Sequence, residues 1–247
     1  MTMANLSGKG PTEFPLIQLL PNMLTITAIC AGLSSIRAAY QTDFVAAVQL
    51  ILLAAILDGI DGKIARLLGS DSRLGAELDS LADFLNFGVA PGLVLYFWVI
   101  EDMTSAAWLA VLIYAVCCVM RLARFNVGDK SETPVDKAFF VGVPAPAGAL
   151  LVLLPMFVSF ALADNPVVPG IVVCIHAVLV GLLMISRIPT WSFKKTRIQR
   201  RHVKFVLVAV AIIGAAVMLQ PWTTLVAICI AYIGTVVWAF VHHVKKV

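Results

Sequence analysis

Four aspartates stand as two pairs in short segments of the chain, Asp58 with Asp61 and Asp79 with Asp83. Carboxylates that come close together repel one another unless a cation lies between them. Oxygen ligands of this kind suit a hard divalent ion such as Mg²⁺ or Mn²⁺. These residue types therefore predict a metal site, provided that the fold brings the two pairs together.

The first pair of acids shares a helix face with small residues. At about 100° per residue, Asp61 lies roughly 60° from Asp58 around a helix. Gly62 and Ala65 fall on the same narrow face, and Gly75 stands one helical turn before the second pair. Walls without long side chains leave room for a bulky ligand beside the carboxylates.

The second pair repeats this arrangement. Asp79 and Asp83 are four residues apart, so they share a helix face, and Asn86 falls on it as well. If the two helices pack antiparallel across their short connection, the four carboxylates converge. The alternative is a purely structural charge network, in which Arg66 and Arg73 neutralise two of the acids.

The elements that hold these residues must lie in a membrane. Of the 247 residues, 61% are hydrophobic and 13% charged, against roughly 45–50% and about 25% in soluble domains. A membrane span takes about 20 apolar residues, and the chain has eight apolar runs of suitable length. We predict an all-α polytopic membrane bundle of about eight transmembrane helices. The predicted spans are residues 22–40, 43–64, 80–100, 105–125, 141–163, 167–186, 203–219 and 222–241.

The connections between these spans differ in charge. Those after the first, third, fifth and seventh spans carry no Lys or Arg, and of the 18 Lys and Arg residues all but Arg37 fall on the opposite side. The positive-inside rule puts that basic side, with both termini, in the cytoplasm. The four acids lie at this edge of their spans, which predicts a site facing the cytoplasm. His176, the one histidine inside a span, is predicted to be a hydrogen-bonded core residue.

The acids are also part of a longer motif. It reads Asp58-x-x-Asp61-Gly62-x-x-Ala65-Arg66, eight further residues, then Gly75-x-x-x-Asp79-x-x-x-Asp83. This stretch resembles the signature of the CDP-alcohol phosphatidyltransferase family at all eight fixed positions. The resemblance implies a membrane enzyme that transfers a phosphatidyl group from a CDP-linked lipid to an alcohol and releases CMP.

The resemblance also implies a role for each motif residue. Asp58, Asp61 and Asp79 would be ligands to two divalent metal ions, Mg²⁺ or Mn²⁺. Asp83 would touch the second metal and act as the catalytic base for the attacking hydroxyl. The residues expected to bind CDP-diacylglycerol lie at the cytoplasmic ends of the first three spans: Asn22, Thr25, Gly62, Ala65, Arg66, Ser72 and Gly75.

Weaker matches concern the acceptor alcohol. The segments Pro21-Asn22-x-x-Thr25, Gly142 to Gly148, and Pro189 to Lys195 look like parts of bacterial family members that use serine, as does a total of eight spans. One departure is visible, because many of those members carry Asn where Thr27-Ala28 stands here. The prediction is transfer from CDP-diacylglycerol to L-serine, giving phosphatidylserine and CMP.

Two arginines near the end of the fourth predicted span are candidates for contacts with the acceptor or with a phosphate. Arg121 and Arg124 are three residues apart, and Asn126 follows them. Guanidinium groups bind carboxylates and phosphates through paired hydrogen bonds. The alternative is an ordinary anchor at the basic membrane edge.

Two other functions remain open at this stage. One is the same transfer to another acceptor, such as glycerol 3-phosphate, an inositol phosphate or choline. The other is an ion-coupled transporter, whose intramembrane acids would bind the coupling ion. The acids lie at one membrane edge, and the sequence indicates no repeated half and no broken pair of helices, which argues against a transporter.

The predicted organisation has three parts. Residues 1–21 form a cytoplasmic segment with a short interfacial helix, residues 22–186 the catalytic transmembrane core, and residues 187–247 a basic connection with two further spans. The expected partners are CDP-diacylglycerol, L-serine, membrane lipid and a second copy of the chain in a homodimer, without nucleic acid. The expected location is the bacterial inner membrane.

Overall fold

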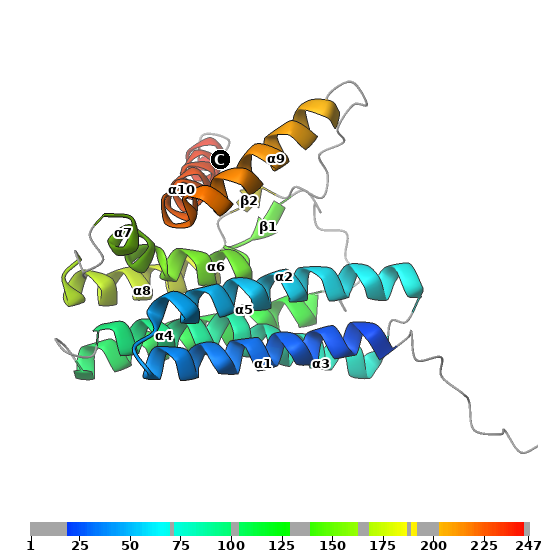
Figure 1. Cartoon of the computed structure of the whole chain (residues 1–247), viewed down its shortest axis with the longest axis horizontal. Coiled ribbons are helices and arrows are strands. Elements are labelled where there is room, and N and C mark those ends of the chain that lie inside the picture. The colour runs from blue at the N-terminus through cyan, green and yellow to red at the C-terminus, as the bar shows by residue number, and fades with distance from the viewer. Residues whose placement is uncertain are drawn as a thin grey trace, which may run out of the picture.

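The structure is a computed structural model, and it describes residues 19–69, 72–99, 104–128, 139–162, 168–186, 189–191 and 203–244. Helices make up nearly all of these residues, which confirms the predicted all-α class. The helices are α1 Leu20–Tyr40, α2 Phe44–Leu68, α3 Arg73–Asp83, the π-helix η2 Phe84–Val89, α4 Ala90–Val99, α5 Thr104–Gly128, α6 Ala145–Val152, α7 Leu154–Leu162, α8 Gly170–Ile185, α9 Val203–Leu219 and α10 Pro221–Val244. Figure 1 shows α1, α2, α4 and α5 running in a common direction.

Local signals set where the two acid-bearing helices begin and end. The Asp43 side chain accepts a 3.0 Å hydrogen bond from the backbone N–H of Ala46, which caps the start of α2. Gly69 ends α2 in the left-handed region, with φ of 59°. Ser72 then caps α3 by accepting a 2.9 Å hydrogen bond from the N–H of Gly75. The chain therefore reverses within a few residues, and both pairs of acids stay near the same end of the bundle.

Small side chains let α1 and α2 pack closely. Ala28 and Ala31 of α1 and Ala54 of α2 are buried together, with Leu57 beside them. Small residues at a helix contact in a membrane allow the two backbones to approach. This contact brings the first turns of α1 against the acidic end of α2.

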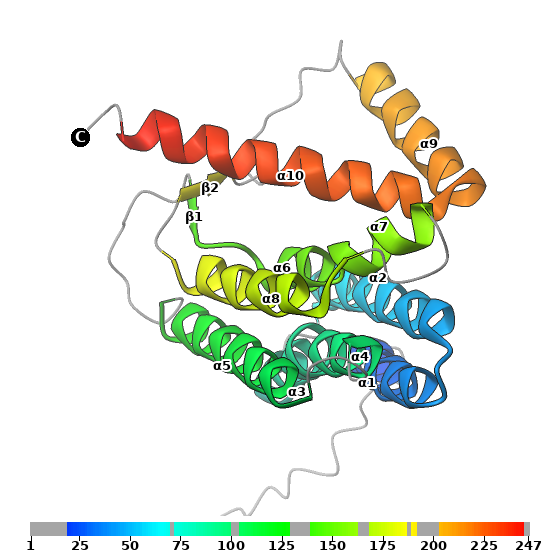
Figure 2. The ribbon, with the colours of Figure 1, turned by 90° about the vertical axis from the view of Figure 1, so that its left-hand side faces the viewer.

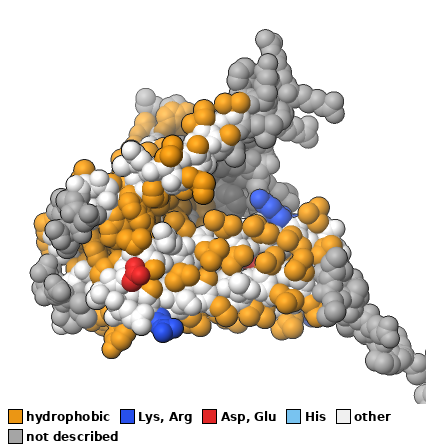
Figure 3. Space-filling view, viewed as in Figure 1, with side chains coloured by type: hydrophobic (Ala, Val, Ile, Leu, Met, Phe, Trp, Pro, Cys, Tyr) orange, Lys and Arg blue, Asp and Glu red, His pale blue; other side chains and the backbone are white. Residues whose placement is uncertain are grey.

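Several helices match the dimensions of a membrane. Among the described residues, five are long and apolar enough to cross it, at 20–40, 44–68, 73–99, 105–127 and 221–239, and a sixth results if α6 and α7 count as one span. Hydrophobic side chains cover much of the outer surface in Figure 3. The protein is an integral membrane protein. The predicted count of eight is not confirmed, because α8 and α9 have only 16 and 17 residues.

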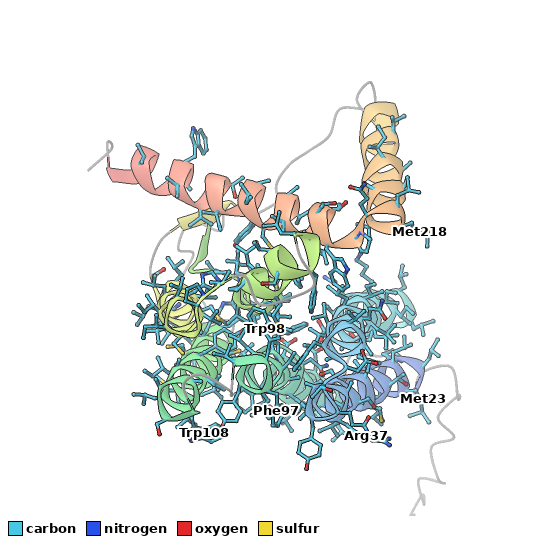
Figure 4. The ribbon with its side chains drawn as sticks, turned by 60° about the vertical axis from the view of Figure 1, so that its left-hand side comes forward. Met23, Arg37, Phe97, Trp98, Trp108 and Met218 are labelled. Carbon is cyan, nitrogen blue, oxygen red and sulfur yellow. The ribbon has the colours of Figure 1, made fainter. Side chains whose placement is uncertain are left out.

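Aromatic rings gather at the end of the bundle that lies away from the acids. Tyr40 packs edge-on against Phe97, which contacts Tyr96, and Tyr96 contacts Trp108, with ring centroids 5.4 to 5.9 Å apart. Figure 4 shows Phe97 and Trp108 on this part of α4 and α5. Tyr and Trp are enriched where a protein meets the membrane–water interface. These rings therefore mark the second membrane edge, opposite the acidic one.

The fifth predicted span is wrong as a single helix. It consists of α6 and α7, which are bent by 41° at Leu153. Pro155 has no backbone N–H, and its ring crowds the carbonyl of Leu151 one turn before it. His176 of α8 lies 2.7 Å from that carbonyl oxygen, which confirms it as a hydrogen-bonded core histidine. The expectation of no broken pair of helices is wrong for the same reason.

Two further features differ from the sequence-based expectations. The third helix begins at Arg73, not near residue 80, and contains the π-helical segment η2. Two strands of three residues, β1 Phe139–Val141 and β2 Pro189–Trp191, pair antiparallel with Phe140 opposite Thr190. This strand pair joins segments 50 residues apart in the chain, so local sequence gives little sign of it.

The last helix, α10, does not run in the direction shared by α1, α2, α4 and α5. Figures 1 and 2 show α10 running across α1, α2 and α5, with one half beside β2 and the other beside α7. Residues 1–18 of the predicted N-terminal segment 1–21, and the basic residues 192–202, lie outside the described residues, while residues 20 and 21 already belong to α1. The division of the chain into three parts stays a prediction.

Candidate active site

A cavity of about 450 Å³ lies between the first turns of α1, the end of α2 and the start of α3. All seven residues predicted to bind the nucleotide lipid line it, together with two of the four acids. Two further lining residues, Pro21 and Ala76, were not predicted. The complete lining is Pro21, Asn22, Thr25, Asp61, Gly62, Ala65, Arg66, Ser72, Gly75, Ala76 and Asp79.

The carboxylates converge beside this cavity. One oxygen from each of Asp58, Asp61 and Asp79 lies within 4.8 Å of the others. Asp61 is only 2% exposed, and its Oδ2 accepts a 2.6 Å hydrogen bond from the hydroxyl of Thr25. The Oδ1 atoms of Asp58 and Asp61 are buried without a hydrogen-bond partner. Buried carboxylate oxygens without donors are suited to a cation.

The fourth acid lies on the inner side of this group. Asp83 is in side-chain hydrogen-bonding contact with Asp58 and interacts electrostatically with Arg121 of α5. It is not among the three acids whose oxygens surround one point. Asp83 therefore has Asp58 on one helix and Arg121 on another as neighbours.

Arginines do not neutralise these acids in the way that the structural alternative requires. In the described part of the chain, none of the four carboxylates forms an ion pair. Arg66 turns back along α2, where its Nε donates a 2.9 Å hydrogen bond to the carbonyl of Gly62, and Arg73 is exposed on α3. The set of donors, all carboxylate oxygens and two of them without partners, fits divalent metal ions better than a charge network.

Small residues keep the cavity open. A methyl group built on Gly62 would meet no atom within 4 Å, whereas one on Gly75 would lie 3.0 Å from Oδ1 of Asn22. Gly62 thus borders open space, and Gly75 allows the start of α3 to approach α1. Thr27 points away from the cavity, because it is exposed and its hydroxyl donates to the carbonyl of Met23. The departure at Thr27-Ala28 therefore does not alter the cavity wall.

The π-helix η2 follows Asp83 directly and lies deeper in the bundle. Its Asn86 is fully buried, and neither the amide oxygen nor the amide nitrogen has a hydrogen-bond partner. A Cβ at Gly32 of α1 would overlap the Asn86 oxygen. The carbonyl of Phe87 accepts a 2.6 Å hydrogen bond from the hydroxyl of Tyr114. Isolated π-helical turns occur frequently at functional sites, and this one fixes the helix that carries Asp79 and Asp83.

The three residues predicted to contact the acceptor have different neighbours. Arg121 is buried near Asp83. Arg124 instead donates 2.8 Å and 3.5 Å hydrogen bonds to the carbonyls of Ile185 and Met184, the last residues of α8. Asn126 donates a 3.1 Å hydrogen bond to the hydroxyl of Ser80. Arg121 is therefore the one of the three that faces the acids, while Arg124 and Asn126 hold neighbouring helices.

The segment from Gly142 to Gly148 also contacts the end of α8. Gly142 has φ of 84°, and a Cβ there would lie 2.5 Å from the carbonyl oxygen of Met184. The N–H of Val143 donates a 3.3 Å hydrogen bond to the carbonyl of Leu183. Only glycine fits this close, left-handed turn. The segment therefore positions α6 and α8, and through Arg124 the end of α5.

Known protein families include one that this chain matches over most of its length. Residues 18–185 match the family described as CDP-alcohol phosphatidyltransferase. The chain belongs to this family. A further match, to CDP-alcohol phosphatidyltransferase 2, covers residues 201–235. The family predicted from the eight motif positions is thus confirmed; the family is metal-dependent in general, and the chain has a cluster of three acids, Asp58, Asp61 and Asp79.

Similarity to individual relatives extends along most of the chain. A CDP-diacylglycerol-serine O-phosphatidyltransferase of Mycobacterium leprae is 41% identical over 229 residues, which cover 92% of this chain and 76% of that protein. The protein of the same name in Helicobacter pylori is 33% identical over 91% of this chain and 92% of its own length. The one in Bacillus subtilis is 36% identical over 71% of this chain and 92% of its own length.

Proposed function

We propose that this CDP-alcohol phosphatidyltransferase transfers the phosphatidyl group of CDP-diacylglycerol to the hydroxyl of L-serine, producing phosphatidylserine and CMP. The observation that carries the proposal is the 41% identity, over 92% of the chain, to a relative named for transfer to serine. This similarity reaches well beyond the nucleotide motif, so it includes the helices that would have to bind the acceptor.

The reaction requires one bond to form and one to break. The serine hydroxyl oxygen bonds to the phosphorus that carries diacylglycerol. The bond from this phosphorus to the oxygen that bridges to CMP breaks, and its electron pair leaves with CMP. The hydroxyl proton passes to the carboxylate of Asp83. A carboxylate within hydrogen-bonding reach of the nucleophile is suited to this general-base role.

The residues of the cavity would bind and orient the nucleotide lipid. Gly62, Ala65 and Gly75 leave space for the cytidine group, and Asn22 and Ser72 offer polar atoms at its rim. Arg66 lies on the same wall, and its guanidinium would bind the pyrophosphate. The lipid tails would extend sideways between helices into the membrane.

The carboxylates would hold two divalent ions, Mg²⁺ or Mn²⁺. Asp58, Asp61 and Asp79 supply oxygens near one point, and Asp83 lies beside Asp58. Bound ions of this kind stabilise the charge that develops on phosphoryl oxygens during transfer. Thr25 holds the Asp61 carboxylate in one orientation through its 2.6 Å hydrogen bond.

We also propose that the enzyme is a homodimer in the bacterial inner membrane, with its active site facing the cytoplasm. The positive-inside rule supports this orientation, because all but Arg37 of the 18 Lys and Arg residues lie on the side of the acids. In a variant with the exposed Cys30 replaced by Ser, Asp129→Cys should resist impermeant thiol reagents in intact cells and Asp164→Cys should react. The reverse labelling pattern would contradict the proposed orientation.

The proposed homodimer has a separate test. Native mass spectrometry of the purified protein should show two copies of the chain, and a monomer would contradict the dimer.

A panel of acceptors tests the proposed substrate. Purified enzyme in detergent, with CDP-diacylglycerol and Mn²⁺, is given serine, glycerol 3-phosphate, inositol phosphate or choline, and CMP release is measured. We expect release to depend on serine and to stay at the background rate with the other three. Faster release with another acceptor would contradict serine while leaving the family chemistry intact.

A further inference from the structure

Buried polar atoms without partners are concentrated near the acids. In the described part of the chain there are six such side-chain atoms. Two are Oδ1 of Asp58 and Asp61, which belong to the proposed metal site. The other four belong to Asn86, Arg121 and Tyr232. An unpaired buried polar group costs about 1–3 kcal/mol, and more if it is charged, so these atoms require a partner that the described residues do not supply.

Arg121 carries the largest of these costs because it is a cation. Its side chain is 8% exposed, and its Nε has no hydrogen-bond partner. It interacts electrostatically with Asp83 on one side and with Tyr232 on the other. The phenol oxygen of Tyr232 is itself buried and unpartnered. An unpaired guanidinium N–H and an unpaired hydroxyl therefore lie near each other, next to the proposed catalytic base.

Tyr232 comes from α10, the helix that crosses the rest of the bundle. One turn before it, the buried Cys229 lies 3.7 Å from the carbonyl oxygen of Leu150 in α6, and Leu225 is buried a further turn away. These contacts pack this stretch of α10 against the bundle, and Figure 2 shows the helix running past α6 and α7. Tyr232 and the α10 residues that hold it in place therefore lie outside residues 18–185, the part of the chain that matches the CDP-alcohol phosphatidyltransferase family.

We infer that Arg121 and Tyr232 form the subsite for the α-carboxylate of the acceptor amino acid, so that α10 completes the active site. This inference rests on the proposed transfer to serine. A guanidinium and a phenol hydroxyl both donate hydrogen bonds, and a carboxylate only accepts them. The reacting hydroxyl and the carboxylate of serine are separated by two carbon atoms, which suits neighbouring Asp83 and Arg121. An acceptor without an anionic group, such as choline, leaves both donors unpaired, which is a strong basis for discrimination.

The test compares Tyr232→Phe with Tyr40→Phe. Both substitutions remove only a phenol oxygen, and Tyr40 is 74% exposed at the opposite membrane edge. Activity is measured with serine and with serinamide, in which an uncharged amide replaces the carboxylate. Tyr232→Phe should raise the KM for serine about tenfold, as expected for loss of a hydrogen bond to a charged group. Its KM for CDP-diacylglycerol and its rate with serinamide should stay within twofold, and Tyr40→Phe should match the wild type.

A second substitution tests whether the two residues act on the same group. Arg121→Lys keeps the charge but loses the paired donors. If both side chains bind one carboxylate, the double variant should raise the KM for serine by less than the product of the two single effects. An unchanged KM for serine in Tyr232→Phe, multiplicative effects, or a higher KM for CDP-diacylglycerol would overturn the inference. If the wild type makes no phosphatidylserine, the proposed function fails before any variant is compared.

Discussion

The hydroxyl of Thr25 donates a 2.6 Å hydrogen bond to Oδ2 of Asp61, and this bond joins the first turns of α1 to the carboxylate cluster. Both side chains are buried, with exposures of 4% and 2%. Thr25 stands outside the eight fixed positions of the motif. Its contact means that the orientation of a predicted metal ligand depends on a second helix.

Thr25→Val should weaken metal binding. Valine keeps the branched shape but removes the donor, so Asp61 loses the contact that orients it. Loss of a hydrogen bond to a ligand side chain typically costs about 10- to 100-fold in metal affinity or activity. Titration with Mn²⁺ followed by electron paramagnetic resonance measures the affinity. The matched control is Thr27→Val, whose hydroxyl donates only to the carbonyl of Met23; equal affinities in both variants would contradict the role of Thr25.

Asp83→Asn should lower kcat while leaving substrate binding nearly intact. The substitution keeps the volume and one oxygen but removes the proton acceptor, and loss of a general base costs ~10² to 10⁴ in rate. Asp58→Asn should also weaken binding of the metal and of CDP-diacylglycerol. The comparison requires kcat and KM for both variants. Near-normal turnover of Asp83→Asn with serine would exclude it as the base and leave a metal-bound water as the next candidate.

Gly62→Ala should fill part of the cavity without disturbing the fold. No atom lies within 4 Å of the added methyl group, so the helix can accept it. The KM for CDP-diacylglycerol should rise about tenfold, the usual effect of one misplaced carbon in a pocket. Gly59→Ala is the control, because it is on the same helix, also meets no atom within 4 Å and does not line the cavity. Equal KM values in the two variants would mean that the nucleotide lipid does not occupy this space.

Tyr114→Phe should lower stability. Tyr114 is fully buried, and its hydroxyl donates a 2.6 Å hydrogen bond to the carbonyl of Phe87 within η2. Removing the donor takes one buried hydrogen bond from this carbonyl, at a net cost of about 0.5–1.5 kcal/mol. The melting temperature of the purified protein in detergent should fall, and that of Tyr40→Phe should not. An unchanged melting temperature in Tyr114→Phe would show that the bond contributes nothing.

Helical periodicity made the core of the site predictable. Asp58, Asp61, Gly62 and Ala65 share a face because of their spacing, and a short reversal after Gly69 is enough to bring the second pair of acids opposite them. The apolar runs likewise predicted the approximate positions of most helices, since a membrane leaves the backbone few alternatives, but they missed the start of the third helix at Arg73 and the bend in the fifth span. Local rules were therefore sufficient for the motif and for the approximate positions of most helices.

Contacts between distant segments were not predictable in the same way. Arg121 and Arg124 are three residues apart, yet one faces Asp83 and the other binds the end of α8, because α8 supplies carbonyls only to the second. Pro155 is itself a local signal for the bend at Leu153, but the residue within hydrogen-bonding distance of the Leu151 carbonyl, His176, comes from another helix. Tyr232 reaches Arg121 only through the packing of α10. Each of these features requires knowledge of which helices are neighbours.

The most direct test of the central claim is the stoichiometry of the complete reaction. Purified enzyme is given radiolabelled serine and CDP-diacylglycerol, and labelled lipid and free CMP are counted in the same sample, before and after chelation with EDTA. We predict one CMP for each phosphatidylserine, no product after chelation, and full recovery when Mg²⁺ or Mn²⁺ is added back. Labelled lipid formed at the full rate after exhaustive chelation, or CMP released without any labelled lipid, would contradict the account.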